Sequence, residues 1–174
     1  MKKIIITLLV CSMLVTLASC GDGSKSGESS AVSEEANVTP ITVEDLKGLI
    51  IEKKAFEGAL IDCTSLADYA LDTLGVASDL YSSHVFLEVE DTTNSYETIC
   101  VFVATSDDNA NAIKTKLDAY IASLKAQFGN YNQTIIDMVN KSVVKVDGNK
   151  AYLIISPNVA EIEKVITNNL GSLK

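Results

Sequence analysis

The side chains best suited to chemistry in this sequence are few, with one histidine and four cysteines among 174 residues. His84 stands alone, so neither a Ser/His/Asp triad nor a zinc site with several histidines can be built in its usual form. It lies beside two serines at the start of a predicted strand, where a surface or edge role is the ordinary one. No Cys-x-x-Cys pair, Gly-x-Ser-x-Gly motif or glycine-rich phosphate loop occurs. The sequence therefore predicts no catalytic residue, no metal ligand and no cofactor.

Two of the cysteines, Cys63 and Cys100, lie in the region that we expect to fold. In an exported protein they could form a disulfide, which would stabilise the fold by roughly 4 kcal/mol in the chain-entropy model. Alternatively, both are reduced thiols that pack as small apolar side chains, since Cys100 lies in an apolar run. Spacing alone does not decide between these interpretations, because it does not show whether the two side chains meet.

The other two cysteines belong to an N-terminal leader. Two lysines follow Met1, then comes an apolar stretch from Ile4 to Leu17, and then Ala-Ser-Cys at positions 18 to 20. This order predicts a signal peptide over residues 1–19, since a membrane-spanning helix needs about 20 apolar residues. The Leu-Ala-Ser-Cys order resembles the lipobox of bacterial lipoproteins, which implies cleavage between Ser19 and Cys20 and a diacylglycerol thioether on Cys20. An unmodified thiol at Cys20 after ordinary signal cleavage is the alternative.

The lipid would determine where the protein resides. Each buried methylene contributes about 0.8 kcal/mol, and two acyl chains anchor a protein stably where one is marginal. We therefore expect the membrane to be a partner through Cys20, with the protein on the outer face of the cytoplasmic membrane. Residues 20–40 are rich in Ser, Gly and Glu and predict a disordered tether with an average span of about 25 Å. Residues 41–174 have the length of one domain.

Charge limits the partners of the exported chain. Without the leader it has 12 lysines against 23 acidic side chains, a formal net charge of −11. Such a surface repels nucleic acid, so we expect no nucleic-acid partner. The sequence contains no arginine, which is the side chain best suited to grip phosphate or carboxylate with two hydrogen bonds. A charged partner should be a basic molecule or a cation.

Two acidic clusters invite a metal or a paired-carboxylate interpretation. Glu88, Glu90 and Asp91 form one of them, and Asp107 and Asp108 form the other. Neither matches the spaced oxygen ligands and central glycine of a calcium loop. The N-terminus of a helix accounts for the second cluster and a solvated strand end for the first.

Periodicity predicts helices and strands that alternate along the chain. Apolar residues at helical spacing predict helices that begin near Thr42, Ser65, Asp107 and Pro157, the second of which should stop at Gly75. Alternating or wholly apolar runs predict two β-hairpins, 84–104 and 143–156, the latter turning at Asp147-Gly148. These elements predict an α+β fold in a single domain, an antiparallel sheet of about four strands packed against helices.

The order of these elements resembles a known family. The lipobox, the Leu74-Gly75-Val76 segment, the strand "ICVFVA", the long helix after "SDD" and the hairpin "VVKVDGNKAYLIIS" are similar to small lipoproteins of Gram-positive, clostridia-like bacteria classed as domain of unknown function 4358. The resemblance implies an extracytoplasmic lipoprotein without an assigned activity and adds no catalytic residue.

Three functions fit these observations. We favour a non-enzymatic binding or adaptor domain with an unknown protein or small-molecule partner. A cell-envelope hydrolase that uses carboxylates such as Glu88 or Asp107 is one alternative. The other is a small solute-capturing lipoprotein of an uptake system, although about 130 folded residues is small for two lobes that close on a ligand.

Overall fold

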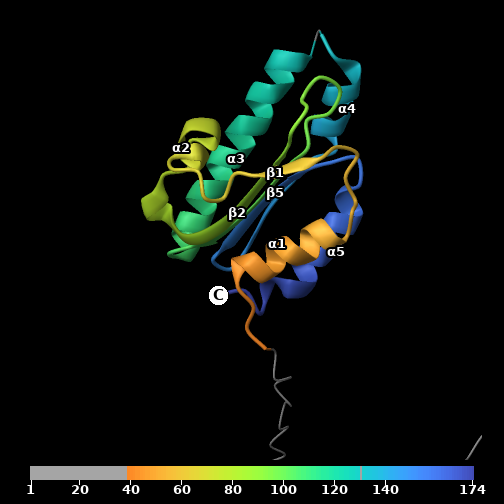
Figure 1. Ribbon diagram of the computed structural model, residues 1–174. Coiled ribbons are helices and arrows are strands. Elements are labelled where there is room, and N and C mark those ends of the chain that lie inside the picture. The colour runs from red at the N-terminus through yellow and green to blue at the C-terminus, as the bar shows by residue number, and fades with distance from the viewer. Residues whose placement is uncertain (1–38, 130) are drawn as a thin grey trace, which may run out of the picture. The chain divides into compact units, whose positions relative to one another are not determined.

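The computed structural model describes residues 39–129 and 131–174, which form one antiparallel sheet with helices on both faces (Figure 1). The strand order is β1-β2-β3-β5-β4. The strands are β1 (Leu60–Asp62), β2 (Tyr81–Val89), β3 (Thr98–Ala104), β4 (Val143–Asp147) and β5 (Lys150–Ile155). The helices are α1 (Val43–Glu52), α2 (Tyr69–Leu74), α3 (Asp107–Phe128), α4 (Gln133–Asn140) and α5 (Val159–Leu170), with a 3-10 turn η1 at Ser78–Leu80.

The predicted α+β class is confirmed, with one more strand than expected. β1 is three residues long and pairs with the end of β2. So short a strand produces no alternating pattern, which is why the sequence predicts about four strands. The predicted leader, residues 1–19, and nearly all of the predicted tether, residues 20–40, lie outside the described residues. None of the described helices is long and apolar enough to cross a membrane.

The central strand β3 divides the core in two, because all seven of its residues are buried and successive side chains point to opposite faces. Ile99, Val101 and Val103 pack in the cluster beneath α1 and α5. Cys100 and Phe102 pack in the cluster beneath α2, α3 and α4. Figure 1 shows α1 and α5 on one side of the sheet and α2 and α3 on the other. Burying each large apolar side chain contributes about 1.5–3 kcal/mol, so this strand holds both layers of helices.

Local sequence signals explain where the elements begin and end. Thr42 and Asp45 form a capping box at the start of α1, in which each side chain accepts the other residue's backbone N–H. Gly75 ends α2 with φ at 70°, as predicted. The predicted second hairpin is confirmed, and its loop is Gly148 and Asn149 between paired Asp147 and Lys150. Gly148 has a φ of 54°, a value that glycine adopts without strain.

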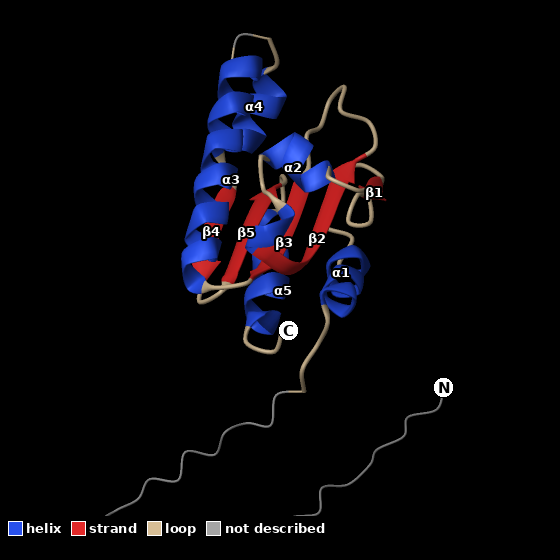
Figure 2. Ribbon diagram, turned by 90° about the vertical axis from the view of Figure 1, so that its left-hand side faces the viewer, coloured by secondary structure: helices blue, strands red, loops and turns tan. Residues whose placement is uncertain are grey.

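The two chain ends of the domain lie together. Ile41 and Leu173 form a parallel bridge, and the N–H of Ile41 donates to the carbonyl of Ser172 at 2.9 Å. α1 leads away from this bridge, and α5 returns to it. Figure 2 shows the C-terminus at one end of the sheet and the loop that joins β2 to β3 at the other. The domain therefore has a bridge end, where the chain joins it, and a loop end.

Cys63 and Cys100 do not form the disulfide that we considered; both are buried free thiols. The N–H of Cys63 donates to the carbonyl of Phe86 at 2.8 Å, and Phe86 pairs with Cys100 on its other side. The two cysteines are thus two strands apart, about 10 Å at the usual strand spacing. A disulfide requires Cα atoms within about 7 Å. In the structure both thiols are reduced and pack as small apolar side chains.

Candidate functional site

A cavity of about 330 Å³ lies at the loop end of the domain. Its walls are the loop between α1 and β1 and the loop between β2 and β3. The lining residues are Glu57, Gly58, Ala59, Val89, Glu90, Asp91, Asn94 and Ser95. Its volume is at the lower limit of about 300–1,000 Å³ for ligand pockets, so it suits a small group or one side chain of a partner.

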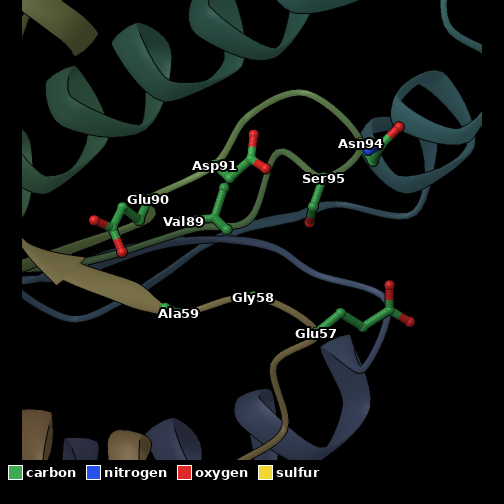
Figure 3. A pocket seen from close by; sticks show the side chains of 8 residues that line it. All are labelled: Glu57, Gly58, Ala59, Val89, Glu90, Asp91, Asn94 and Ser95. Atoms are coloured by element: carbon green, nitrogen blue, oxygen red, sulfur yellow. The ribbon is translucent and has the colours of Figure 1, made fainter.

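The side chains around the cavity divide into a floor and a rim. Val89 is buried and points toward Gly58, and the hydroxyl of Ser95 faces the space between the two loops (Figure 3). The carboxylates of Glu57, Glu90 and Asp91 lie around the edge and point in different directions (Figure 3). They make a negative rim, not a cage of converging ligands. Among the described residues no group of three or more His, Cys, Asp or Glu side chains is placed to hold a metal ion.

Behind this cavity lies Glu97, a fully buried carboxylate that holds both walls. Its Oε1 accepts from the backbone N–H groups of Glu57 at 2.9 Å and Gly58 at 3.3 Å, in the α1–β1 loop. The same oxygen accepts from the Ser95 hydroxyl at 3.2 Å, in the β2–β3 loop. Its Oε2 accepts from the Ser156 hydroxyl at 3.3 Å, at the end of β5. One side chain therefore joins three segments that are far apart in the sequence.

The hydrogen bonds around Glu97 explain how a carboxylate is accommodated in the interior. Burying a charge is costly unless hydrogen bonds replace the water that it loses. The two oxygens of Glu97 accept four hydrogen bonds from the protein, three at Oε1 and one at Oε2. None of the five salt bridges among the described residues involves Glu97. The donors to this buried side chain are all uncharged: two backbone N–H groups and two hydroxyl groups.

Gly58 is required where it stands. A Cβ atom added at this residue would overlap the Val89 side chain. Only glycine lets the α1–β1 loop come close enough to β2 for its N–H to reach Glu97. The close contact between Gly58 and Val89 at the floor of the cavity is thus possible because residue 58 has no side chain.

A second hollow of about 240 Å³ adjoins the first at Glu57. It is lined by Glu57, Thr134, Asp137, Met138, Lys141 and Pro157. Lys141 gives this hollow a basic group, whereas none of the described residues that line the first cavity is basic. The first hollow is therefore the more acidic, with three carboxylates and no basic group, whereas two carboxylates and one lysine line the second.

His84 lies in β2 away from the cavity, packed among aromatic rings. Its imidazole stacks on Phe102 with centroids 5.5 Å apart and meets the edge of Tyr81 at 4.7 Å. Burial lowers the pKa of His84 below its ordinary value of 6.5. The ring is thus neutral near pH 7 and acts as part of the aromatic packing.

Glu88 and Asp107, the carboxylates that we considered for hydrolysis, are not brought together. Glu88 pairs with Thr98 at one end of β3, whereas Asp107 begins α3 beyond Ala104 at the other end. Six residues of strand separate those ends by about 20 Å, which is more than the 5–10 Å between the carboxylates of glycosidases. Glu88 is partly buried and accepts from the Tyr69 hydroxyl at 2.6 Å, and burial raises its pKa.

Glu97 was not singled out from the sequence, and the signal for it is faint. It is an acidic residue directly before an apolar strand, where a solvated strand end is the usual interpretation. Ser156, which donates to it, lies 59 positions away. Glu90 and Asp91 were recognised as a solvated acidic cluster, but the sequence does not show that the α1–β1 loop faces them.

The fold and this site define a small antiparallel α+β domain with an acidic cavity at its loop end. The family described as Domain of unknown function (DUF4358) matches residues 67–156, just over half of the chain, so the chain belongs to this family. No curated protein matches the chain, and no solved structure matches it either. The matched range includes Val89 to Glu97 but not the α1–β1 loop, so it contains one wall of the cavity.

Replacing Glu97 should show how far the cavity walls depend on it. We expect Glu97→Ala to lower the free energy of unfolding by about 3 kcal/mol, because four hydrogen bonds lose their acceptor and the buried side chain leaves a cavity. Glu97→Gln keeps one oxygen for the α1–β1 loop and places an amide toward Ser156, so its loss should be about 1 kcal/mol. Urea unfolding followed by circular dichroism measures both values. Equal losses for the two variants would show that the hydrogen bonds are not what Glu97 contributes.

The single histidine gives a clean pH test. Because the pKa of His84 is lower in the fold than in the unfolded chain, its stabilising contribution is present above pH 6.5 and is lost as the pH falls through the folded pKa. We expect the free energy of unfolding of the wild type to fall relative to that of His84→Phe as the pH is lowered from 7.5 to 5. A histidine ring titration by NMR should give a midpoint below 6.5. A midpoint above 6.5 would contradict the burial argument.

Proposed function

We propose that this protein is a lipid-anchored, extracytoplasmic binding domain, held at the outer face of the membrane through Cys20 and using its loop end to bind a partner. The anchor is supported by the Leu-Ala-Ser-Cys motif and the apolar leader before it. The binding role is supported by the cavity between the α1–β1 and β2–β3 loops. No observation favours the hydrolase, since Glu88 and Asp107 lie at opposite ends of β3.

The proposal rests on the positions of two features: the chain joins the domain at one end, and the cavity lies at the other. The chain joins the fold at Ile41, which bridges to Leu173 at the bridge end. The cavity begins at Glu57, beyond the far end of α1. α5 starts just after Ser156, which contacts Glu97, and ends near Leu173. Helices of 10 and 12 residues span about 15 and 18 Å, so the cavity lies roughly that far from the point of attachment.

This arrangement suits a domain that is tethered at one end. A tether that joins the bridge end leaves the loop end free to face away from the lipid. A cavity beside the attachment point would instead lie next to the tether. The acidic rim would also be repelled by anionic headgroups, which favours the same orientation.

The anchor is tested at Cys20, with Cys11 as the matched control. We expect Cys20→Ala to lose incorporation of radiolabelled palmitate and to leave the membrane fraction for the soluble or secreted fraction, because its acyl chains are missing. Cys11→Ala changes a thiol inside the leader and should keep both properties. Unchanged labelling and fractionation in Cys20→Ala would contradict the lipid anchor.

The binding role is tested by photo-crosslinking in intact cells. Asn94 is exposed and lines the cavity, and Asn111 is exposed on α3 away from it. A benzoylphenylalanine placed at position 94 should capture a specific neighbour, whereas the same residue at position 111 should not. Mass spectrometry of the crosslinked product identifies that neighbour. Equal capture at both positions, or none at position 94, would contradict a binding role for the loop end.

A further inference from the structure

We propose that α1 is a releasable part of the anchor: under tension on the tether it detaches from the sheet and unwinds, while the sheet and the cavity wall remain folded. This inference rests on the proposed function, because the tether is under tension only where Cys20 is anchored and the loop end holds a partner. It is carried by three features: α1 is weakly attached, it is a weak helix, and the chain directly after it is firmly held.

α1 is the first element that tension on the tether reaches. The described chain enters the fold at Ile41, whose N–H donates to the Ser172 carbonyl at 2.9 Å and whose carbonyl accepts from the N–H of Lys174 at 3.1 Å. α1 begins two residues later, at Val43, and leads from this bridge to the loop before β1 (Figure 1). Once the bridge at Ile41 opens, α1 carries the tension.

Apolar burial is the main attachment of α1 to the sheet. Leu46 and Ile50 are its buried side chains, and Val43 is partly buried against the same cluster. Among the described residues, no backbone hydrogen bond joins residues 42–54 to another segment. A short row of side chains therefore holds the helix in place, with no ladder of main-chain hydrogen bonds to break.

Two ion pairs add to this attachment, and both lie at the surface. Lys47 contacts Asp62 at 2.6 Å, and Lys53 contacts Glu161 at 3.1 Å. Lys53 and Glu161 are both exposed to solvent, and Asp62 is partly exposed. Because water and salt screen such pairs, they contribute little to holding the helix.

The helix itself is weakly stabilised. It has 10 residues, and isolated helices shorter than about 12–15 residues are marginal in water. Gly48 lies in its middle, where a Cβ atom would meet nothing within 4 Å, so packing does not require glycine there. Lys54, just beyond the helix, has a φ of 51°, which is unfavourable for a residue with a side chain. A detached α1 therefore unwinds, and Lys54 relaxes with it.

The chain is held more firmly directly after α1. Ala55 is 8% exposed, and its carbonyl accepts from the Asn158 amide at 3.0 Å. The N–H groups of Glu57 and Gly58 donate to Glu97. These hydrogen bonds join the α1–β1 loop to the start of α5 and to the residue before β3. Tension that releases α1 is therefore resisted at this junction, and the cavity wall stays in place.

Release of α1 lengthens the tether. A helix of 10 residues is about 15 Å long, whereas residues 41–54 reach about 45 Å when fully extended. The domain can then lie up to about 30 Å farther from the membrane without losing a partner at its loop end. Because Leu46 and Ile50 regain their burial when the tension falls, the helix docks again. The device is reversible.

Native-state hydrogen exchange tests the release in the absence of lipid and partner. The full chain is studied by NMR in detergent micelles at increasing urea concentrations. We expect the amide protons of α1 to exchange at least about tenfold faster than those of β3, because they exchange through release of α1 alone. Their exchange should also depend less on urea, since this opening exposes less surface than unfolding of the sheet. Equal exchange and equal urea dependence in α1 and β3 would overturn the proposal.

Two matched variants identify the opening. Ile50→Ala and Ile113→Ala remove the same atoms from fully buried residues on opposite faces of the sheet. Ile50→Ala should speed exchange in α1 by about 30-fold or more, since Ile50 is buried only while α1 is docked. Ile113→Ala should speed exchange in β3 and leave that of α1 within about twofold, because Ile113 stays packed after α1 is released. Equal acceleration of α1 by both variants would show that α1 opens only with the whole domain.

A stabilising variant tests the unwinding. Gly48→Ala places a methyl group in open space and favours the helical state by about fivefold. If the released segment unwinds, exchange in α1 should slow by about that factor. An unchanged rate would contradict the unwinding, because alanine and glycine differ in this way only when the helix is lost.

Force spectroscopy measures the added length. One handle is attached to Cys20 and the other at position 94 after Asn94→Cys, with Cys11→Ala to leave a single reactive thiol before the domain; the two cysteines of the domain are buried. We expect a reversible extension of up to about 30 Å before the sheet unfolds. Moving the first handle from Cys20 to position 57, by Glu57→Cys with Cys20→Ala, bypasses α1 and should remove this step. A step that persists there, or none with the Cys20 handle, would overturn the proposal.

A failure of the proposed function gives a different set of results. If Cys20→Ala stays in the membrane fraction or position 94 captures nothing in cells, while exchange and force show the release, the releasable helix stands and the anchoring or binding role is wrong. If α1 opens only with the whole domain while fractionation and crosslinking behave as expected, the proposed function stands and the releasable helix is wrong.

Discussion

The loop end of this domain depends on one buried carboxylate, that of Glu97. Three segments meet there that have no continuous backbone ladder between them: the α1–β1 loop, the β2–β3 loop and the end of β5. Each sends a donor to Glu97, and two of these donors are the backbone N–H groups of Glu57 and Gly58. Loss of the Glu97 carboxylate would therefore remove hydrogen bonds from all three segments at once, although the Asn158 amide would still donate to the Ala55 carbonyl.

The sheet determines where that carboxylate stands. β3 is buried on both faces and paired on both edges, so Glu97 is held between the two neighbours of β3 just before the strand begins. Its neighbour β2 continues into the wall that carries Glu90 and Asp91, and its other neighbour β5 ends at Ile155, directly before Ser156. The order β2-β3-β5 therefore brings to one place the residues that surround Glu97. The same order places the chain ends at the opposite pole through α1 and α5.

Most of the fold can be read from the sequence, since the signals that predict it are local. The capping box at Thr42, the apolar stripe of α3 and the Asp147-Gly148 turn depend on residues within a few positions of each other. β1 was missed, because three residues on the edge of a sheet carry no periodic pattern, and α4 was not among the four predicted helices. The disulfide could not be decided from the sequence, because it depends on whether Cys63 and Cys100 occupy neighbouring strands, and Phe86 lies between them. Glu97 could not be found at all, since its donors come from positions up to 59 residues away.

The same excess of negative charge acts differently at short and at long range. At long range, a net charge of −11 on the proposed exported chain attracts cations and repels anionic surfaces, but ions screen this effect beyond about 10 Å at 0.1 M salt. General attraction of this kind cannot select one basic ligand from another. At short range the arrangement of charge matters, because Glu57, Glu90 and Asp91 line one cavity and their charge acts where a partner at the loop end would lie. The buried carboxylate of Glu97 contributes to this arrangement by holding the two loops that carry these three residues.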